Sequence, residues 1–147
     1  ALQQNGISTA ALREFTTEIP ARKQLLFLDA CHSGKAVKSF NMRGAAEQKA
    51  LFMLAESSGV TMISSTDSEQ YASEVSQIGH GIFTYALLEA IEGKADGGRK
   101  DGSITVKEID AYLGYRVPEL TQQYRGQFQK PMSFSEGQDF PLVIVNE

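Results

Sequence analysis

Two short apolar runs constrain the fold of this chain. Residues 24–30 read QLLFLDA and residues 59–66 read GVTMISST, and neither run alternates between polar and apolar side chains. A continuous apolar run of this length is typical of a strand buried on both faces, as in a parallel sheet. Helices are predicted before, between and after these strands, at residues 8–19, 45–57, 82–93 and 105–120. A further short strand is predicted at residues 139–145. This alternation predicts an α/β fold with a mainly parallel sheet.

Length and composition narrow the function classes. The chain has 147 residues, a net charge of −4 and one cysteine. It has no basic run, so we expect no nucleic-acid partner, and no apolar segment long enough to span a membrane. A single cysteine leaves no internal disulfide and no multi-cysteine metal site. A lone thiol is compatible with a reducing cytoplasm, which is the expected location.

The start of the chain and the number of strands suggest a partial domain. The first residue is Ala1 rather than methionine, and about three strands are predicted, fewer than sheets of this kind commonly have. We therefore expect residues 1–147 to form one partial domain. Its first strands, and any targeting signal, would lie upstream of residue 1.

The single cysteine, Cys31, follows the first predicted strand in the segment DACHSG. The carboxyl ends of strands are where open α/β sheets place their chemistry. A lone cysteine is more commonly a buried structural residue. Asp29, His32 and Ser33 beside it favour a nucleophile instead, because a structural strand end rarely carries so many polar groups.

A thiol nucleophile needs a base or a stabilised thiolate. His32 is adjacent to Cys31, and neighbouring side chains of an extended chain point to opposite sides. His80 lies in a polar loop before an apolar helix, where a capping or loop role is favoured. The residues of the chain therefore offer a nucleophile without a convincing base.

Several segments resemble the caspase-like cysteine peptidases, in particular the metacaspase and bacterial orthocaspase branch. They are LLFLDACHSG, VTMISSTDSEQYASE, GIFTYALLEAIEGKAD, DGSITVKEIDAYL and DFPLVIV. The resemblance implies a three-layer α/β/α sandwich, of which this chain is the C-terminal part, and no cofactor. It also implies that Cys31 attacks the scissile carbonyl and that its backbone N–H contributes to the oxyanion hole. The catalytic histidine of caspases lies about 50 residues upstream of the cysteine. It is therefore expected on a segment before Ala1.

The resemblance also implies a substrate preference. Asp29 occupies the position of a glutamine in true caspases and lies two residues before Cys31, on the same side of a strand. A carboxylate at the floor of a pocket selects a cation, and metacaspase-like enzymes cleave after Arg or Lys. Asp67 is expected as a second wall of the pocket, and it equally suits a turn or helix cap. Ser64, Ser65 and Gln70 are expected to contribute.

The segment KDGSITVKEID imitates half of a calcium-binding EF-hand loop. The first ligand positions would be Gly97, Arg99 and Asp101; a glycine and a cationic arginine cannot supply carboxylates there. We therefore expect a turn followed by a helix that begins near Ser103 or Thr105, and no metal site.

Two further readings compete with an active peptidase. An inactive caspase-like interaction or regulatory module is compatible with the missing histidine. A redox-sensing thiol is disfavoured, because a nearby carboxylate such as Asp29 opposes thiolate formation. If the enzyme processes itself, a basic residue should precede Ala1. Further basic sites follow the cysteine at Lys35, Lys38 and Arg43.

Overall fold

The computed structural model describes residues 7, 9–29, 49, 52–53, 55–56, 59–65, 81–98, 100–126, 128–135 and 138–145. The chain forms two compact units. The first comprises residues 1–26, 36–62 and 134–137, and the second comprises residues 27–35, 63–133 and 138–147. Helices and strands alternate through both, which confirms the predicted α/β class.

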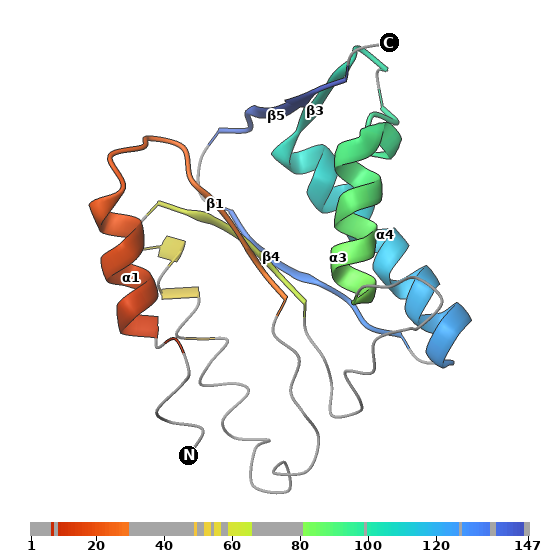
Figure 1. Cartoon of the computed structure of the whole chain (residues 1–147), viewed down its shortest axis with the longest axis horizontal. Helices are drawn as coiled ribbons and strands as arrows, with labels where there is room; N and C mark the ends of the chain where they lie inside the picture. Colours follow the sequence, from red (N-terminus) through yellow and green to blue (C-terminus); the bar gives the residue numbers. More distant parts are fainter. Residues whose placement is uncertain are drawn as a thin grey trace, which may run out of the picture. The chain divides into compact units, whose positions relative to one another are not determined.

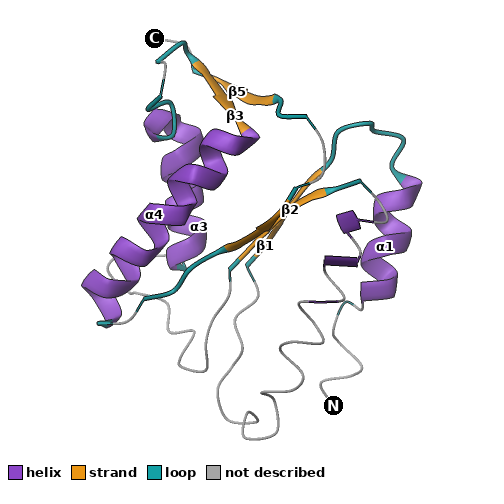
Figure 2. Ribbon diagram, turned by 180° about the vertical axis from the view of Figure 1, so that it is seen from behind, coloured by secondary structure: helices purple, strands orange, loops and turns teal. Residues whose placement is uncertain are grey.

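A three-stranded sheet contains β1 (Leu25–Leu28), β2 (Thr61–Ser64) and β4 (Met132–Phe134), in the order β1-β2-β4. Figure 2 shows β1 beside β2. The backbone N–H of Thr61 donates to the carbonyl of Gln24 at 3.0 Å, and that of Ser65 donates to Leu28 at 2.9 Å. Both partners advance by four residues, so β1 and β2 run parallel, as predicted.

The two predicted buried strands differ in burial. All four residues of β2 are buried, whereas all four residues of β1 are only half-buried. The prediction that residues 24–30 are buried on both faces is therefore wrong for β1. The physical reason is its place in the sheet: among the described strands, β2 has neighbours on both sides and β1 has one.

In the first unit, α1 spans Thr9–Glu18, within the predicted helix, and Pro20 follows it. The side-chain amide of Gln24 donates to the carbonyls of Thr16 at 2.9 Å and of Ile19 and Ala21 at 3.2 Å. This fixes the turn that leads from the helix into β1. The described residues of the predicted helix 45–57 are also helical.

In the second unit, α3 (Ile82–Glu89) continues into the π-helical turn η3 (Ala90–Lys94) and packs beside α4 (Val106–Arg125) (Figure 1). The helical conformation that begins at Ile82 breaks at Gly93, near the end of η3. Its φ of 117° is a conformation that favours glycine, and this confirms the predicted stop at Gly93. The apolar core of these helices is fully or almost fully buried; it includes Phe83, Ala86, Ile109, Leu113 and Val117.

The segment that imitates an EF-hand forms a helix start, as expected. The Thr105 side chain accepts the backbone N–H of Glu108, and the Glu108 carboxylate accepts that of Thr105 at 2.8 Å. This capping box uses the one glutamate that an EF-hand would need as its last ligand. At the other end, α4 closes on Gly126, which has a φ of 66°. Pro118 lies inside the helix.

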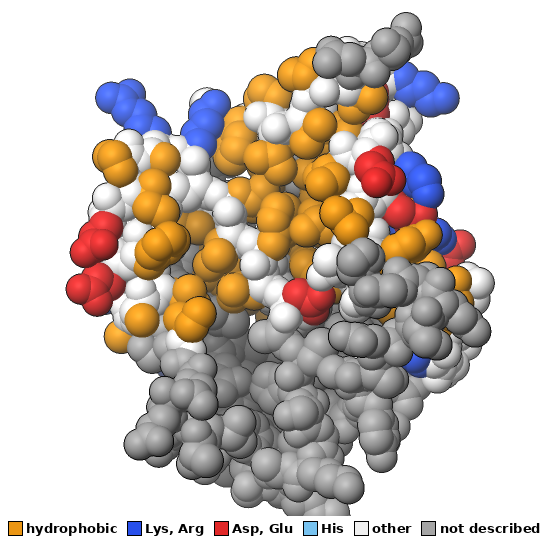
Figure 3. All heavy atoms as spheres, in the orientation of Figure 1, with side chains coloured by type: hydrophobic (Ala, Val, Ile, Leu, Met, Phe, Trp, Pro, Cys, Tyr) orange, Lys and Arg blue, Asp and Glu red, His pale blue; other side chains and the backbone are white. Residues whose placement is uncertain are grey.

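β3 (Ser103–Thr105) pairs antiparallel with β5 (Pro141–Ile144), with Ser103 opposite Ile144. The sequence predicted β5 and missed β3 and β4, which have three residues each. So short a strand has no periodicity from which to recognise it. Figure 3 shows hydrophobic side chains gathered over β5 and α3. Leu142 and Ile144 of β5 are 42% and 65% exposed.

Candidate active site

Asp29 and Ser65 lie together where β1 and β2 end. Each residue directly follows its strand, and the carboxyl ends of parallel strands meet at one edge of a sheet. The Ser65 hydroxyl donates to Oδ1 of Asp29 at 3.0 Å. The structure thus brings together two of the residues that the sequence assigned to one pocket.

The start of α3 supplies the second contact of this carboxylate. The Thr84 hydroxyl donates to Oδ2 of Asp29 at 2.5 Å. Gly81, the N-cap of α3, also lies against the same oxygen: a Cβ atom at Gly81 would be 3.0 Å from Oδ2. Sequence reasoning missed both residues. The only available signal was a glycine followed three residues later by a threonine at the start of a predicted helix.

The two hydroxyls leave Asp29 accessible. The Asp29 side chain is exposed, whereas Ser65 is only 8% exposed. Each carboxylate oxygen accepts a hydrogen bond from one of these hydroxyls. The arrangement is therefore an exposed carboxylate whose two oxygens are held by hydroxyl donors from two different elements.

The remaining predicted site residues are placed differently. Ser64 is 6% exposed at the end of β2. Neighbouring side chains of a strand point to opposite faces, so Ser65 rather than Ser64 is the one that faces Asp29. Cys31, Asp67 and Gln70, together with His32 and His80, lie outside the described residues.

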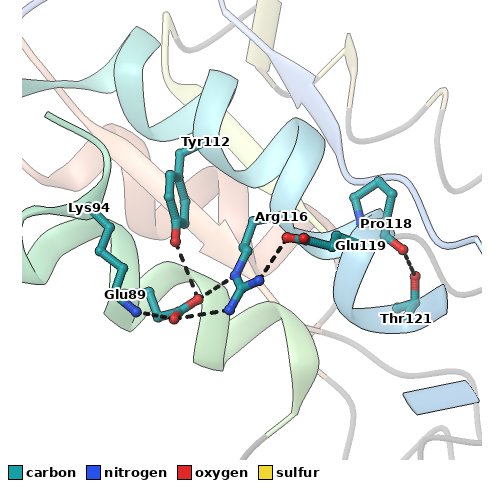
Figure 4. Close-up of polar contacts among 7 residues, drawn as sticks. All are labelled: Glu89, Lys94, Tyr112, Arg116, Pro118, Glu119 and Thr121. Atoms are coloured by element: carbon teal, nitrogen blue, oxygen red, sulfur yellow. Dashed lines mark hydrogen bonds and ion pairs between the residues drawn. The ribbon is translucent and has the colours of Figure 1, made fainter. Parts of the chain in front are cut away.

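A second polar cluster joins α3 to α4 (Figure 4). Glu89 is 4% exposed and receives two bonds from Arg116, Nε to Oε2 at 2.6 Å and Nη2 to Oε1 at 3.2 Å. The Lys94 ammonium and the Tyr112 hydroxyl also donate to Glu89. Arg116 Nη1 donates to Glu119 at 2.7 Å. Sequence analysis did not predict this cluster.

The electrostatics of the cluster favour its charged form. Hydrogen bonding to Arg116 outweighs burial and lowers the pKa of Glu89 from 4.5 to about 2. The same bond raises the pKa of Arg116, and the bond to Glu89 raises that of Lys94. Burial, reinforced by the Glu89 charge, raises the pKa of Tyr112 to about 12. The cluster is a fully hydrogen-bonded ion network that ties α3 to α4.

Within the described ranges, no three His, Cys, Asp or Glu side chains gather as a metal site would require. No helix in that part of the chain is long and apolar enough to cross a membrane.

A family model of the caspase domain matches residues 6–138. The chain belongs to the caspase-domain family of peptidases. At the level of the family it is thus a caspase-like cysteine-peptidase domain, and the expected resemblance is confirmed. The match covers most of the chain and includes both the Asp29 site and the segment of Cys31. No curated protein and no solved structure matches the chain.

Proposed function

We propose that this caspase-like domain is a cysteine endopeptidase of the metacaspase and orthocaspase type, which cleaves peptide bonds after Arg or Lys. The observation that carries the proposal is the carboxylate of Asp29, two residues before Cys31. The hydroxyls of Ser65 and Thr84 hold it at 3.0 Å and 2.5 Å. The Asp29 side chain is exposed, as a group that contacts substrate must be.

The proposed reaction is acyl transfer to a thiol. The Cys31 thiolate attacks the carbonyl carbon of the scissile bond, and the backbone N–H of Cys31 stabilises the resulting oxyanion. A histidine promotes thiolate formation and then donates the proton to the leaving amine. Water hydrolyses the acyl-enzyme and restores the thiol. No metal or other cofactor takes part in these steps.

Asp29 supports a basic residue at the cleavage site. A carboxylate attracts Arg or Lys and repels Asp or Glu, so the same charge favours basic substrates and disfavours acidic ones. The hydroxyls of Ser65 and Thr84 donate to this carboxylate without adding a compensating positive charge. The preferred substrates are therefore proteins or peptides with a basic residue before the scissile bond.

We also propose that the histidine base lies on an upstream segment of the same protein, which pairs with β1. Two features support this partner. Caspase-type histidines lie about 50 residues before the cysteine. In addition, the strand residues Leu25–Leu28 are only half-buried, and β1 has one sheet neighbour among the described strands.

The test uses the protein with its upstream sequence and fluorogenic peptides that differ only in Arg, Lys or Asp before the cleaved bond. Cys31→Ala should abolish hydrolysis of the Arg and Lys peptides while the folded structure is retained. Unchanged hydrolysis in Cys31→Ala contradicts the mechanism. A folded wild-type protein without hydrolysis would favour the interaction module.

Asp29→Asn tests the pocket in the same assay. It keeps the shape of the side chain and removes the charge, so kcat/KM for basic peptides should fall about 30-fold, equivalent to about 2 kcal/mol for a lost charged contact. Asp110→Asn is the matched control, because Asp110 also accepts a hydroxyl, from Ser133 at 3.0 Å. A preference for the Asp peptide would overturn the pocket assignment.

A further inference from the structure

We propose that the outward side of α1 is a docking surface for an amphipathic helix of a partner protein, one that carries Lys or Arg beside its apolar residues. The surface consists of Phe15 and Ile19 together with Glu14 and Glu18. The inference goes beyond the peptidase activity and does not depend on it, because it uses none of the residues of the candidate active site.

α1 buries a polar side chain and exposes an apolar one. Thr16 is buried, whereas Phe15 is 64% exposed. Ile19, which directly follows the last residue of the helix, is 38% exposed. Phe15 and Ile19 are four residues apart and therefore lie on the same side. A surface helix ordinarily turns its apolar side toward the core, so the outward side of α1 has the character of a contact surface.

Two carboxylates run beside this apolar pair. Glu14 and Glu18 precede Phe15 and Ile19 by one residue each, and both are exposed. Figure 3 shows acidic and hydrophobic side chains together over α1. Like charges four residues apart on a helix repel each other. Glu18 is also the last residue of α1, where the helix dipole disfavours a negative charge, and the last turn has no basic residue. A cation on this side would relieve both effects.

One kind of partner satisfies the apolar and the acidic residues together. The apolar row of an amphipathic helix would cover Phe15 and Ile19, as in other contacts that a helix makes through one face. Lys or Arg beside that row would lie opposite Glu14 and Glu18 and compensate their charge. Complementary charges at the border of an apolar contact also fix the register and exclude wrong partners. The chemistry of this surface therefore selects a basic amphipathic helix.

A second copy of this chain lacks that chemistry. In a twofold contact the same surface meets itself, so the acidic row of one copy would face the acidic row of the other. Arg13 is the basic residue of α1. It precedes Phe15 by two residues, about 200° around the helix, and so points away from this side. Like charges across an interface are a repulsive element, which disfavours self-association through α1.

The experiment measures the binding of designed peptides to the full chain by fluorescence anisotropy. The probe is a helical peptide of about 14 residues, slightly longer than α1, with leucine on one side and lysine beside it. The wild type should bind it with a dissociation constant on the order of 10 µM. A scrambled peptide of the same composition, and a peptide with glutamate in place of lysine, should each bind at least about 10-fold more weakly.

Variants of the chain separate the apolar from the charged contribution. Phe15→Ser should keep the fold, because the side chain is exposed, and should weaken binding of the lysine peptide about 10-fold. The double variant Glu14→Lys and Glu18→Lys should reverse the preference, so that the glutamate peptide binds better than the lysine peptide. Glu56→Lys with Glu92→Lys is the matched control. It makes the same change in net charge at exposed residues outside α1 and should leave the affinity within about 2-fold.

The outcomes that would overturn the inference are distinct. One is equal affinity of the lysine peptide for the wild type and either α1 variant. Another is equal binding of the scrambled peptide, or no binding by the folded wild type. Sedimentation equilibrium is the last measurement: a wild-type dimer that Phe15→Ser dissociates would assign the surface to a second copy and refute the basic partner.

Discussion

Replacing Glu89 by glutamine removes one negative charge from the contact between α3 and α4 and changes little else in shape. The carboxylate is 4% exposed, and Arg116, Lys94 and Tyr112 all donate to it. Glutamine can still accept from one or two of these donors through its amide oxygen, but its NH₂ group faces donors where an acceptor is needed.

The structure gives the size of the effect. A carboxyl pKa lowered from 4.5 to about 2 corresponds to about 3 kcal/mol of stability at neutral pH. Breaking a buried ion pair from one side costs about 3–5 kcal/mol. Arg116 is 22% exposed and water can partly replace its partner. We therefore expect Glu89→Gln to lower the free energy of unfolding by about 2–3 kcal/mol.

Urea denaturation of the full chain at several pH values is the assay. The folded-state pKa of Glu89 lies below its unfolded value, so its contribution is complete above pH 4.5 and is lost as the pH falls toward about 2. The difference between wild type and Glu89→Gln should narrow over the same range. Glu119→Gln is the control: Glu119 is 59% exposed and bonds the same arginine, and its loss should cost at most about 1 kcal/mol. Equal midpoints for wild type and Glu89→Gln, or a difference that does not change with pH, would refute the reasoning.

Two further predictions concern α4. Thr105→Ala removes the side-chain half of the capping box and should cost about 1 kcal/mol, seen as a lower thermal midpoint; an unchanged midpoint would show that the cap is dispensable. Leu113→Ala leaves a cavity at a side chain with 0% exposure and should cost about 2–5 kcal/mol in urea. A loss below 1 kcal/mol would mean that the α3–α4 core can collapse around the gap.

Sequence reasoning succeeded where the signal is local. The start of α4 was predicted near Ser103 or Thr105, and in the structure Thr105 and Glu108 satisfy each other within that one turn. The stop at Gly93 was predicted for a similar reason. Asp29 and Ser65 were assigned to one pocket from the family resemblance; a hydrogen bond joins the two side chains, and the pocket itself stays a prediction.

It failed where the partner is distant in sequence. Thr84 lies 55 residues from Asp29, and Arg116 lies 27 residues from Glu89. Glu89 is the last residue of the apolar helix α3, and a charged residue at such a position ordinarily faces solvent. Its burial depends on which helix packs against it. The half-burial of β1 likewise depends on which strands lie beside it, and no pattern within residues 24–30 encodes that.

Pro118 divides α4 into two segments that can open separately. Proline has no N–H, so the carbonyl of Gly114 has no helical donor at that point in the 20-residue helix. The first segment is held by its cap at Thr105 and by the bonds of Arg116 to Glu89. The second is held by the left-handed Gly126 and by Thr121, which is 1% exposed. Amide hydrogens after Pro118 should therefore exchange with solvent through a local opening that leaves those before it protected.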